Sequence, residues 1–233
     1  MKTVGERCAP AADRASCQGI LLPEHLALVR EAGRPSSWPR EAVLLRQGDP
    51  ADRAILIERG QVKITAESGS GYTSLLAVRG VGELIGELSA LDGRSRSATV
   101  TAMTAVQGYV VSASVFRRLL MGNGALAMAV LNAVVARLRD SDHRRAEYGA
   151  YGASARTAAV LLDLAEGYGV AVSGSPRGRS IAVTQQELAG AVGTSRESVV
   201  RALRELHHEG LVETSRGKVV VLDLAQLEHW VRR

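Results

Sequence analysis

The amino-acid sequence predicts an α+β fold in three parts: a β-rich amino-terminal domain, one long helix, and a mainly helical carboxyl-terminal domain. Short apolar runs with period two, broken by glycines, fill residues 38–111. Helical periodicity follows over 123–147, and two short amphipathic helices are expected to meet at Gly193. With 233 residues, of which 46% are hydrophobic, the chain is long enough for one or two domains with a real core.

Residues 1–21 are polar and predict a flexible extension that lacks the apolar segment of a signal peptide. Both cysteines, Cys8 and Cys17, lie there, which favours free thiols over a structural disulfide. No apolar run reaches the roughly 18 residues of a membrane span, so we expect a cytoplasmic protein without a membrane partner. The five histidines are scattered and no catalytic grouping stands out, so neither a metal site nor an enzyme is expected.

Residues 22–122 are expected to form the β-rich domain. Strand-like runs are VLLRQGDP at 43–50, AILIERGQVKIT at 54–65, SLLAV at 74–78 and SATVTAMTAVQGYVVS at 97–112. Strands this short and evenly spaced favour a β-sandwich or a small barrel.

The stretch GVGELIGELSALDGRSRSATV, 80–100, contains candidate ligand-binding groups. Gly82 and Gly86 are expected to expose backbone N–H groups where a loop can close around an anion. Glu87 offers an acceptor for sugar hydroxyls, and Arg96 with Ser97 offers a charge and a donor for a phosphate. The sequence therefore suggests a sugar-phosphate site, although a simple pair between Glu87 and Arg96 at a strand end is an equal alternative.

Residues 123–147 predict a long helix with two adjoining apolar stripes. One consists of Leu126, Val130 and Val134, and the other of Met128, Leu131, Val135 and Leu138. This surface is wider than one neighbouring domain requires, which favours pairing with the same helix of a second copy. A helix buried inside a monomer is the alternative. Residues 148–152, YGAYG, then predict a hinge, although a plain loop has the same composition.

Residues 153–233 predict a domain built around TQQELAGAVGTSRESVVRALRELH at 184–207. Ser154 is expected to cap a preceding apolar helix, Gly193 allows a sharp turn, and Thr194 or Ser195 can cap the following helix. The pattern indicates a helix-turn-helix. A hairpin over 211–223 with Gly217 in its turn would add a wing, and LAQLEHWV a closing helix.

The second helix of this motif presents Arg196, Glu197, Ser198, Arg201 and Arg204 on its polar face. Arginine donates to guanine O6 and N7, and glutamate accepts from cytosine N4, so the face suits a DNA major groove. A solvated surface of Glu/Arg pairs is the alternative. The net charge of +5 is compatible with a polyanion. From residue 153 onward, however, ten basic residues nearly balance nine acidic ones. Any attraction of this domain for DNA must therefore come from where its basic side chains are placed.

The order of GELIGELSALDGRSRSA, one long helix and TQQELAGAVGTSRESVVRAL resembles the CRP/FNR family of bacterial transcription regulators, from about residue 22 to the end. The resemblance implies an amino-terminal β-roll of jelly-roll-like type, a dimerisation helix and a winged helix-turn-helix. In cyclic-AMP-responsive members these positions bind the nucleotide. The resemblance thus assigns Glu87 to the ribose and Arg96 with Ser97 to the cyclic phosphate, and the pocket lining to Gly86, Leu88 and Ala98.

The sequence departs from that family pattern at Ser141 and Asp142. Cyclic-AMP receptors have a Thr-Ser pair there, which contacts adenine across the dimer. A carboxylate at Asp142 can accept from adenine N6 or from guanine N1–H and N2–H, or it is an ordinary solvated residue.

The resulting hypothesis is a homodimeric, sequence-specific DNA-binding regulator that requires no cofactor and senses a cyclic nucleotide, cyclic AMP rather than cyclic GMP. RNA polymerase is a further candidate partner. The expected interface residues are Met128, Leu131, Val135 and Leu138. The expected DNA contacts are Thr184, Gln185, Gln186, Ser195, Arg196, Glu197, Ser198, Arg201 and Lys218, with Arg216 beside the last of them. Two alternatives remain: constitutive DNA binding with an empty or differently occupied pocket, and a nucleotide-binding module that regulates a partner protein.

Overall fold

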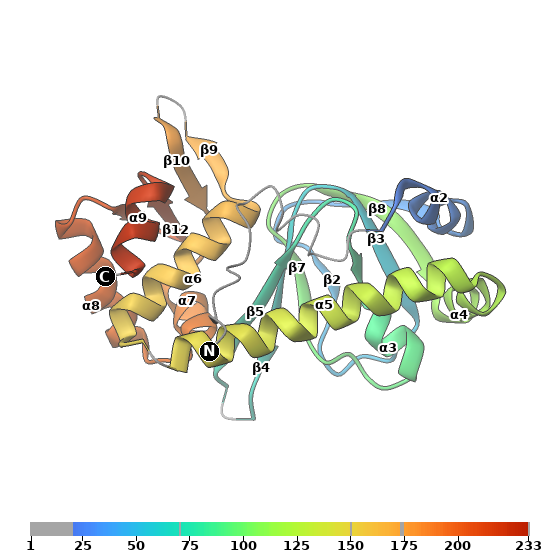
Figure 1. Ribbon diagram of the computed structural model, residues 1–233. Coiled ribbons are helices and arrows are strands. Elements are labelled where there is room, and N and C mark those ends of the chain that lie inside the picture. Colours follow the sequence, from blue (N-terminus) through green and yellow to red (C-terminus); the bar gives the residue numbers. More distant parts are fainter. Residues whose placement is uncertain (1–20, 70, 150, 173–174, 233) are drawn as a thin grey trace, which may run out of the picture.

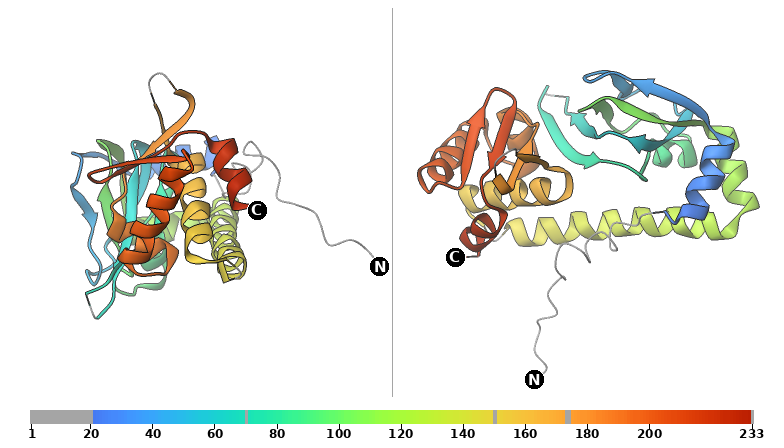
Figure 2. Two further views of the ribbon diagram at one scale, coloured as in Figure 1. Left: turned by 90° about the vertical axis from the view of Figure 1, so that its left-hand side faces the viewer. Right: turned by 90° about the horizontal axis from the view of Figure 1, so that it is seen from above.

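The computed structural model describes residues 21–69, 71–149, 151–172 and 175–232. Figure 1 shows two domains side by side and the long helix α5, Gly124–Gly149, running past both of them. Seen from above, both domains lie on the same side of this helix (Figure 2). The amino-terminal extension with Cys8 and Cys17 lies outside the described residues.

The amino-terminal domain consists of two four-stranded antiparallel sheets. One sheet has the order β1 (Arg34–Trp38), β8 (Val106–Ser112), β3 (Arg53–Arg59), β6 (Leu84–Ile85). The other has the order β2 (Val43–Leu45), β7 (Thr99–Ala102), β4 (Val62–Glu67), β5 (Thr73–Arg79). Ile55 and Ile57 of the first sheet share a buried cluster with Val62 and Val100 of the second. The predicted α+β class with an amino-terminal β-roll is therefore confirmed.

In the part of the domain that the structure describes, the helices beside these sheets are α2 (Pro23–Ala32), α3 (Glu87–Asp92) and α4 (Ala113–Gly122). A second apolar cluster joins Val29 of α2, Phe116 of α4 and Leu126 of α5, all fully buried. This cluster fixes the start of the long helix against the β-roll.

Helix α5 shows different surroundings for its two apolar stripes. Leu126 and Val130 are buried against the chain's own β-roll, whereas Met128, Leu131 and Leu138 are 52–60% exposed. The helix continues through Gly149, so Tyr148 and Gly149 of the predicted hinge are helical, and the next helix begins at Ala153.

The carboxyl-terminal domain contains α6 (Ala153–Tyr168), α7 (Gln185–Val192), α8 (Arg196–His208) and α9 (Leu224–Val231). Its sheet has the order β11 (Val212–Ser215), β12 (Lys218–Val221), β10 (Ser175–Ile181), β9 (Val170–Val172). The expected hairpin and closing helix are confirmed. The prediction that Ser154 caps α6 was wrong: Gly152 holds the N-cap position, and the Ser154 hydroxyl donates to Glu205 at 2.6 Å.

The two domains meet where α7 packs on strand β5, a contact that we call the domain seam. Leu75 and Val78 of β5 belong to the apolar core of the carboxyl-terminal domain. At Gly190 an added Cβ would lie 2.5 Å from Ser74 Cα, so only glycine allows this approach. An ion pair between Lys63 and Glu187 borders the seam.

Tyr72, on the loop before β5, makes a further contact across the seam. Its hydroxyl donates to the backbone carbonyl of Thr194, in the turn between α7 and α8, at 3.1 Å. The β4–β5 hairpin therefore holds the helix-turn-helix directly, not only through α5.

Candidate effector and DNA-binding sites

Glycine at position 86 shapes the first candidate site. Gly86 is the N-cap of α3 with φ +72°, a conformation that side chains disfavour. An added Cβ would lie 2.7 Å from both Arg96 Nη1 and Leu45 Cδ1. The tight turn places Glu87, at the start of α3, and Arg96 next to Gly86, and each residue is only 4% exposed.

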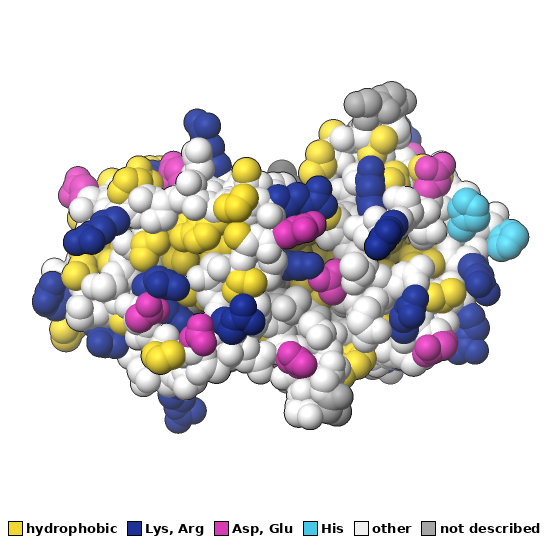
Figure 3. Space-filling model, turned by 180° about the vertical axis from the view of Figure 1, so that it is seen from behind, with side chains coloured by type: hydrophobic (Ala, Val, Ile, Leu, Met, Phe, Trp, Pro, Cys, Tyr) yellow, Lys and Arg dark blue, Asp and Glu magenta, His cyan; other side chains and the backbone are white. Residues whose placement is uncertain are grey.

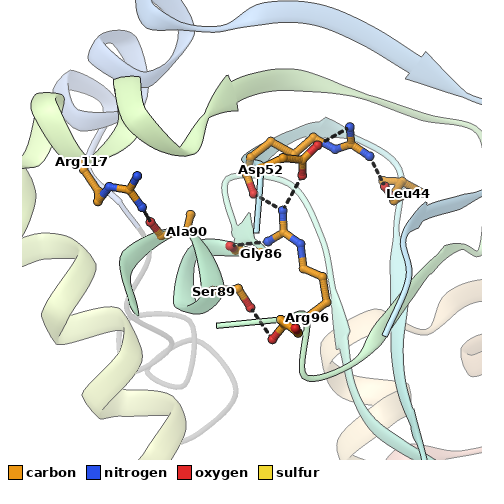
Figure 4. A network of polar contacts seen from close by, with 9 residues as sticks. Leu44, Asp52, Gly86, Ser89, Ala90, Arg96 and Arg117 are labelled. Carbon is orange, nitrogen blue, oxygen red and sulfur yellow. Dashed lines mark hydrogen bonds and ion pairs between the residues drawn. The ribbon is translucent and has the colours of Figure 1, made fainter. Parts of the chain in front are cut away.

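Arg96 is held by three oxygen acceptors (Figure 4). Nη1 donates to the carbonyl of Gly86 at 2.8 Å, and Nη2 donates to the carbonyl of Arg53 at 2.6 Å and to Asp52 Oδ1 at 3.0 Å. The alternative in which Arg96 merely pairs with Glu87 is wrong. A phosphate at this site would have to compete with Asp52, which is itself 56% exposed at its side chain.

Glu87 pairs instead with Arg137 of α5, at 2.5 Å between Oε1 and Nη1. Nη2 of Arg137 also donates to the carbonyl of Leu84 at 3.2 Å. Sequence reasoning missed Arg137. The available signal was its position one helical turn before Ser141, on the same face of the helix.

The other residues expected in the pocket differ in how far they are buried. Ala98 is buried, Ser97 is exposed, and the Leu88 side chain is 49% exposed. Ser141 is half-buried on the Arg137 face and Asp142 is exposed. The expectation of a free N–H at Gly82 was wrong, because that group donates to the Ile57 carbonyl at 2.9 Å.

The space beside Glu87 is a cavity of about 10 Å³. It is lined by Leu21, Gly82, Glu83, Leu84, Glu87, Val130, Ala133, Val134 and Arg137. This is room for about one water, whereas small-molecule sites usually offer roughly 300 Å³ or more. A nucleotide therefore does not fit in this cavity as it stands.

Helix α7 begins with a reciprocal cap. The Thr184 hydroxyl accepts from the Glu187 N–H at 3.2 Å, and a Glu187 carboxylate oxygen accepts from the Thr184 N–H at 2.9 Å. Burial alone would raise the pKa of Glu187, but the hydrogen bonds from Lys63 and Thr184 hold it below its ordinary value. Thr184 and Gln186 are exposed and Gln185 is half-buried.

Helix α8 follows a turn at Gly193, where φ is +67°. Ser195 caps it by accepting from the Ser198 N–H at 3.2 Å, as the sequence predicted. Val199, Ala202, Leu203 and Leu206 are buried on one face. The opposite face is thereby fixed towards solvent.

That solvent face carries the expected DNA-reading side chains. Arg196, Glu197 and Arg201 are exposed, and Arg201 donates to the Ser198 hydroxyl at 3.1 Å. Hydrogen bonds from its own backbone N–H and from Ser195 hold the pKa of Glu197 below its usual range. Arg196 and Arg201 also help to lower the pKa of Glu197, so the alternative of a solvated surface of Glu/Arg pairs stays open.

The β11–β12 hairpin places Arg216 and Lys218 at its exposed end, with Gly217 between them at φ +70°. Seen from behind, basic side chains of this domain stand singly with carboxylates among them (Figure 3). Any attraction for a polyanion therefore depends on which of these groups face it, as the near-equal charge count predicted.

The described residues contain no cluster of three or more His, Cys, Asp or Glu side chains that could hold a metal ion. No single described helix is long and apolar enough to cross a membrane; α4 and part of α5 pass such a test only together, across a bend of 114°.

A β-roll with buried Glu and Arg beside a tight glycine turn, joined by a long helix to a winged helix-turn-helix, defines a class of ligand-sensing DNA-binding proteins. Family models agree: a cyclic nucleotide-binding domain matches residues 35–123, and a Crp-like helix-turn-helix domain matches 155–230. The chain belongs to the CRP/FNR family of transcription regulators, whose members are dimeric.

Individual relatives cover most of the chain. The CRP-like cAMP-activated global transcriptional regulator of Mycobacterium tuberculosis is 29% identical over 215 residues, 92% of this chain and 95% of that protein. The cAMP-activated global transcriptional regulator CRP of Salmonella typhimurium is 30% identical over 186 residues, 79% of this chain and 87% of that protein. A CRP/FNR-family regulator from Thermus thermophilus has a similar structure, with TM-score 0.70, 25% identity, and coverage of 86% of this chain and 99% of that one.

Proposed function

We propose that the chain is a cytoplasmic, homodimeric regulator whose affinity for specific DNA sites is controlled by a cyclic nucleotide bound beside Gly86. The observation that carries this proposal is the burial of two opposite charges, Glu87 and Arg96, beside one glycine turn. Both charges already have partners in the chain, but buried ionisable groups gathered at one turn are more frequent at functional sites than elsewhere, which supports a binding site here.

In this proposal each pocket residue exchanges an internal partner for the ligand. The Glu87 carboxylate accepts from the sugar 2′-hydroxyl in place of Arg137. The Arg96 guanidinium turns from Asp52 to the cyclic phosphate, which also accepts from the Ser97 hydroxyl. Gly86, Leu88 and Ala98 line the site, and Ser141 with Asp142 meets the base.

Cyclic AMP is the proposed effector because the relatives from Mycobacterium tuberculosis and Salmonella typhimurium are cAMP-activated regulators. Asp142 makes cyclic GMP the necessary comparison, since a carboxylate accepts from both bases. Calorimetric titration of the dimer with each nucleotide tests the assignment. Binding of cyclic AMP, lost on Arg96→Ala, is expected; no heat with either nucleotide would contradict it.

On the DNA side, we propose that α8 enters the major groove. Ser195, Arg196, Glu197, Ser198 and Arg201 then face base edges and nearby phosphates, while Thr184, Gln185 and Gln186 at the start of α7 and Lys218 in the wing contact the backbone. Two copies in a dimer must reach grooves about 34 Å apart. Random-site selection with and without cyclic AMP should yield a two-fold symmetric site; selection of no sequence would contradict specific recognition.

The dimer is proposed to form along the exposed stripe of Met128, Leu131, Val135 and Leu138, of which Val135 is half-buried. Leu131→Asp should convert the dimer to a monomer, because a carboxylate would be buried in an apolar helix pair. Light scattering measures the change. Met121→Asp is the matched control, since Met121 is 80% exposed at the end of α4 and off this stripe.

A second candidate function is constitutive DNA binding with no nucleotide effector. It is favoured by the small cavity at Glu87 and by the internal partners that Glu87 and Arg96 already have. The same selection experiment separates the two, because a constitutive regulator selects the same site at the same affinity without nucleotide. RNA polymerase stays a proposed partner, to be tested by transcription in vitro from the selected site.

A further inference from the structure

Two ion pairs and one tyrosine form a continuous chain from the effector pocket to the DNA-binding domain. Arg137 pairs with Glu87 at 2.5 Å. Four residues before Glu87, the Glu83 carboxylate pairs with Arg79 Nε at 3.2 Å. The four side chains are only 6–22% exposed. Both carboxylates and Arg137 line the same cavity of about 10 Å³, so the two pairs are neighbours.

The two pairs also act on each other electrostatically. Burial raises the pKa of the Glu83 carboxyl, whereas Arg79, the Gly80 N–H and Arg137 each pull it down, and Glu87 pushes it up. Glu83 therefore senses Arg137 as well as its own partner. In surroundings with little water such interactions are screened weakly, so a change at one pair is felt at the other.

The far end of this chain is Tyr168, the last residue of α6 in the DNA-binding domain. Its ring lies beside Gly80, the residue next to Arg79, where a Cβ added to Gly80 would be 3.9 Å from Tyr168 Cε1. Burial raises the pKa of the Tyr168 hydroxyl, whereas Arg79 lowers it. The backbone carbonyl of Tyr168 accepts from Gln61 Nε2 at 3.1 Å, which ties the same end of α6 to the β-roll. We call Glu87, Arg137, Glu83, Arg79 and Tyr168 the charged relay.

We propose that Glu83, Arg79 and Tyr168 are positioning residues that transmit occupancy of the effector pocket to helix α6. The inference rests on the proposed function, because it takes a ligand at Glu87 as the trigger. A sugar hydroxyl on Glu87 deprives Arg137 of its partner. Arg137 then turns to Glu83, the neighbouring carboxylate, which weakens the hold of Glu83 on Arg79 and of Arg79 on Tyr168.

The end of α6 is thereby released from the β-roll, and the helix-turn-helix packed on α6 is re-aimed. Helices α6 and α8 share the buried core of this domain, so a shift of α6 moves the reading helix with it. Allosteric control requires that the effector bind one of these two states more tightly, either the state with α6 held on the β-roll or the state with α6 released.

Matched Tyr→Phe variants test this route, because each removes one hydroxyl at the boundary between the two domains. Tyr168→Phe cuts the charged relay. Tyr72→Phe removes the bond to the Thr194 carbonyl at the domain seam and leaves the relay intact. Fluorescence anisotropy with a selected DNA site gives the ratio of DNA affinities with and without cyclic AMP. Tyr168→Phe should lower this ratio at least roughly fivefold, whereas Tyr72→Phe should preserve it.

A second measurement needs no effector. Glu87→Gln removes the charge that holds Arg137, so it should raise DNA affinity in the nucleotide-free protein at least roughly twofold, and this gain should vanish in the Glu87→Gln, Tyr168→Phe double variant. Equal effects of the two Tyr→Phe variants, or independent effects in the double variant, would overturn the relay. If cyclic AMP changes nothing but the Glu87→Gln gain still depends on Tyr168, the relay stands and the proposed effector fails.

Discussion

The charged side chains beside Gly86 are buried, whereas those on the polar face of α8 are exposed to solvent. In the pocket, Glu87 and Arg96 are each 4% exposed, and both already have partners within the chain. On α8, Arg196 and Arg201 are exposed to solvent and rest on a buried apolar face. The charged groups of the pocket are therefore buried and paired within the chain, whereas those of α8 are accessible to a binding partner.

This difference indicates where control acts. Under the proposed function, an effector need not uncover the side chains of α8, because they are already exposed; it would have to set where the two α8 helices of a dimer stand relative to each other. The groups that can do so lie between the two regions, at the domain seam and in the charged relay. Substitutions in each region, and then at the seam, can therefore separate these roles.

The largest effect is expected at the reading face. Arg201→Ala removes a side chain that can bond a guanine in each half-site, at about 1–3 kcal/mol per site, so a dimer should lose about 4 kcal/mol, near a thousandfold, for its selected DNA. Anisotropy titration against selected and random DNA measures this. Arg177→Ala, an exposed arginine on β10, is the control. An equal loss for random DNA would show that Arg201 contacts phosphate and not bases.

A smaller effect is expected in the pocket. Arg96→Ala removes three hydrogen bonds of a buried guanidinium, although the Gly86 carbonyl still accepts from the Ala90 N–H and Asp52 still pairs with Arg53. The variant should lower the free energy of unfolding by about 3 kcal/mol and abolish nucleotide binding. Urea unfolding and calorimetry measure the two consequences. Arg94→Ala, an exposed arginine in the same loop, should change neither. Unchanged stability of Arg96→Ala would mean that the pocket is not internally held.

The sequence predicted the two regions unequally. Period-two runs, the Gly193 turn, the Ser195 cap and the hairpin at Gly217 are local signals, because the residues that cause them are neighbours in the chain. These parts of the fold agree with prediction. One local prediction, the N-cap at Ser154, was wrong. Gly152 occupies the N-cap position, and the Ser154 hydroxyl donates to Glu205, 51 residues away.

The partners of the pocket residues were beyond sequence reasoning. Arg137 lies 50 residues from Glu87 and Asp52 lies 44 residues from Arg96, so only the folded chain brings them together. The same holds for Gly82, whose N–H was expected to be free but donates a hydrogen bond to the Ile57 carbonyl. The sequence identified which charges are special, but it did not show that the chain itself satisfies them.

The domain seam should respond to volume. Gly190→Ala places a methyl group 2.5 Å from Ser74 Cα and 2.7 Å from the Thr73 carbonyl oxygen, so it should lower stability by about 2 kcal/mol through overpacking. Gly167→Ala is the matched control: this helical glycine has open space around it and should gain about 0.5–1 kcal/mol. Thermal unfolding compares them. A gain for both variants would show that α7 does not press on β5 in solution.

The smallest effect concerns charge at the seam. Lys63→Met removes the ammonium that pairs with Glu187 but keeps the apolar stem, and side-chain exposures of 28% and 12% place the pair partly out of water. A pair of this kind contributes about 1 kcal/mol, so the variant should lose about that much stability at pH 7. Lys218→Met, on the exposed wing, should lose nothing measurable.

The pH dependence of that loss has a definite sign. The pKa of Glu187 is held below its ordinary value, so its contribution is fully present above the unfolded carboxyl pKa of about 4.3 and disappears as the pH falls through the lower folded value. The stability difference between the parent protein and Lys63→Met should therefore be constant from pH 7 to about 5 and shrink below that. Urea unfolding at several pH values measures it. A difference that is the same at pH 4 as at pH 7 would mean that Lys63 supports the seam by packing and not by its charge.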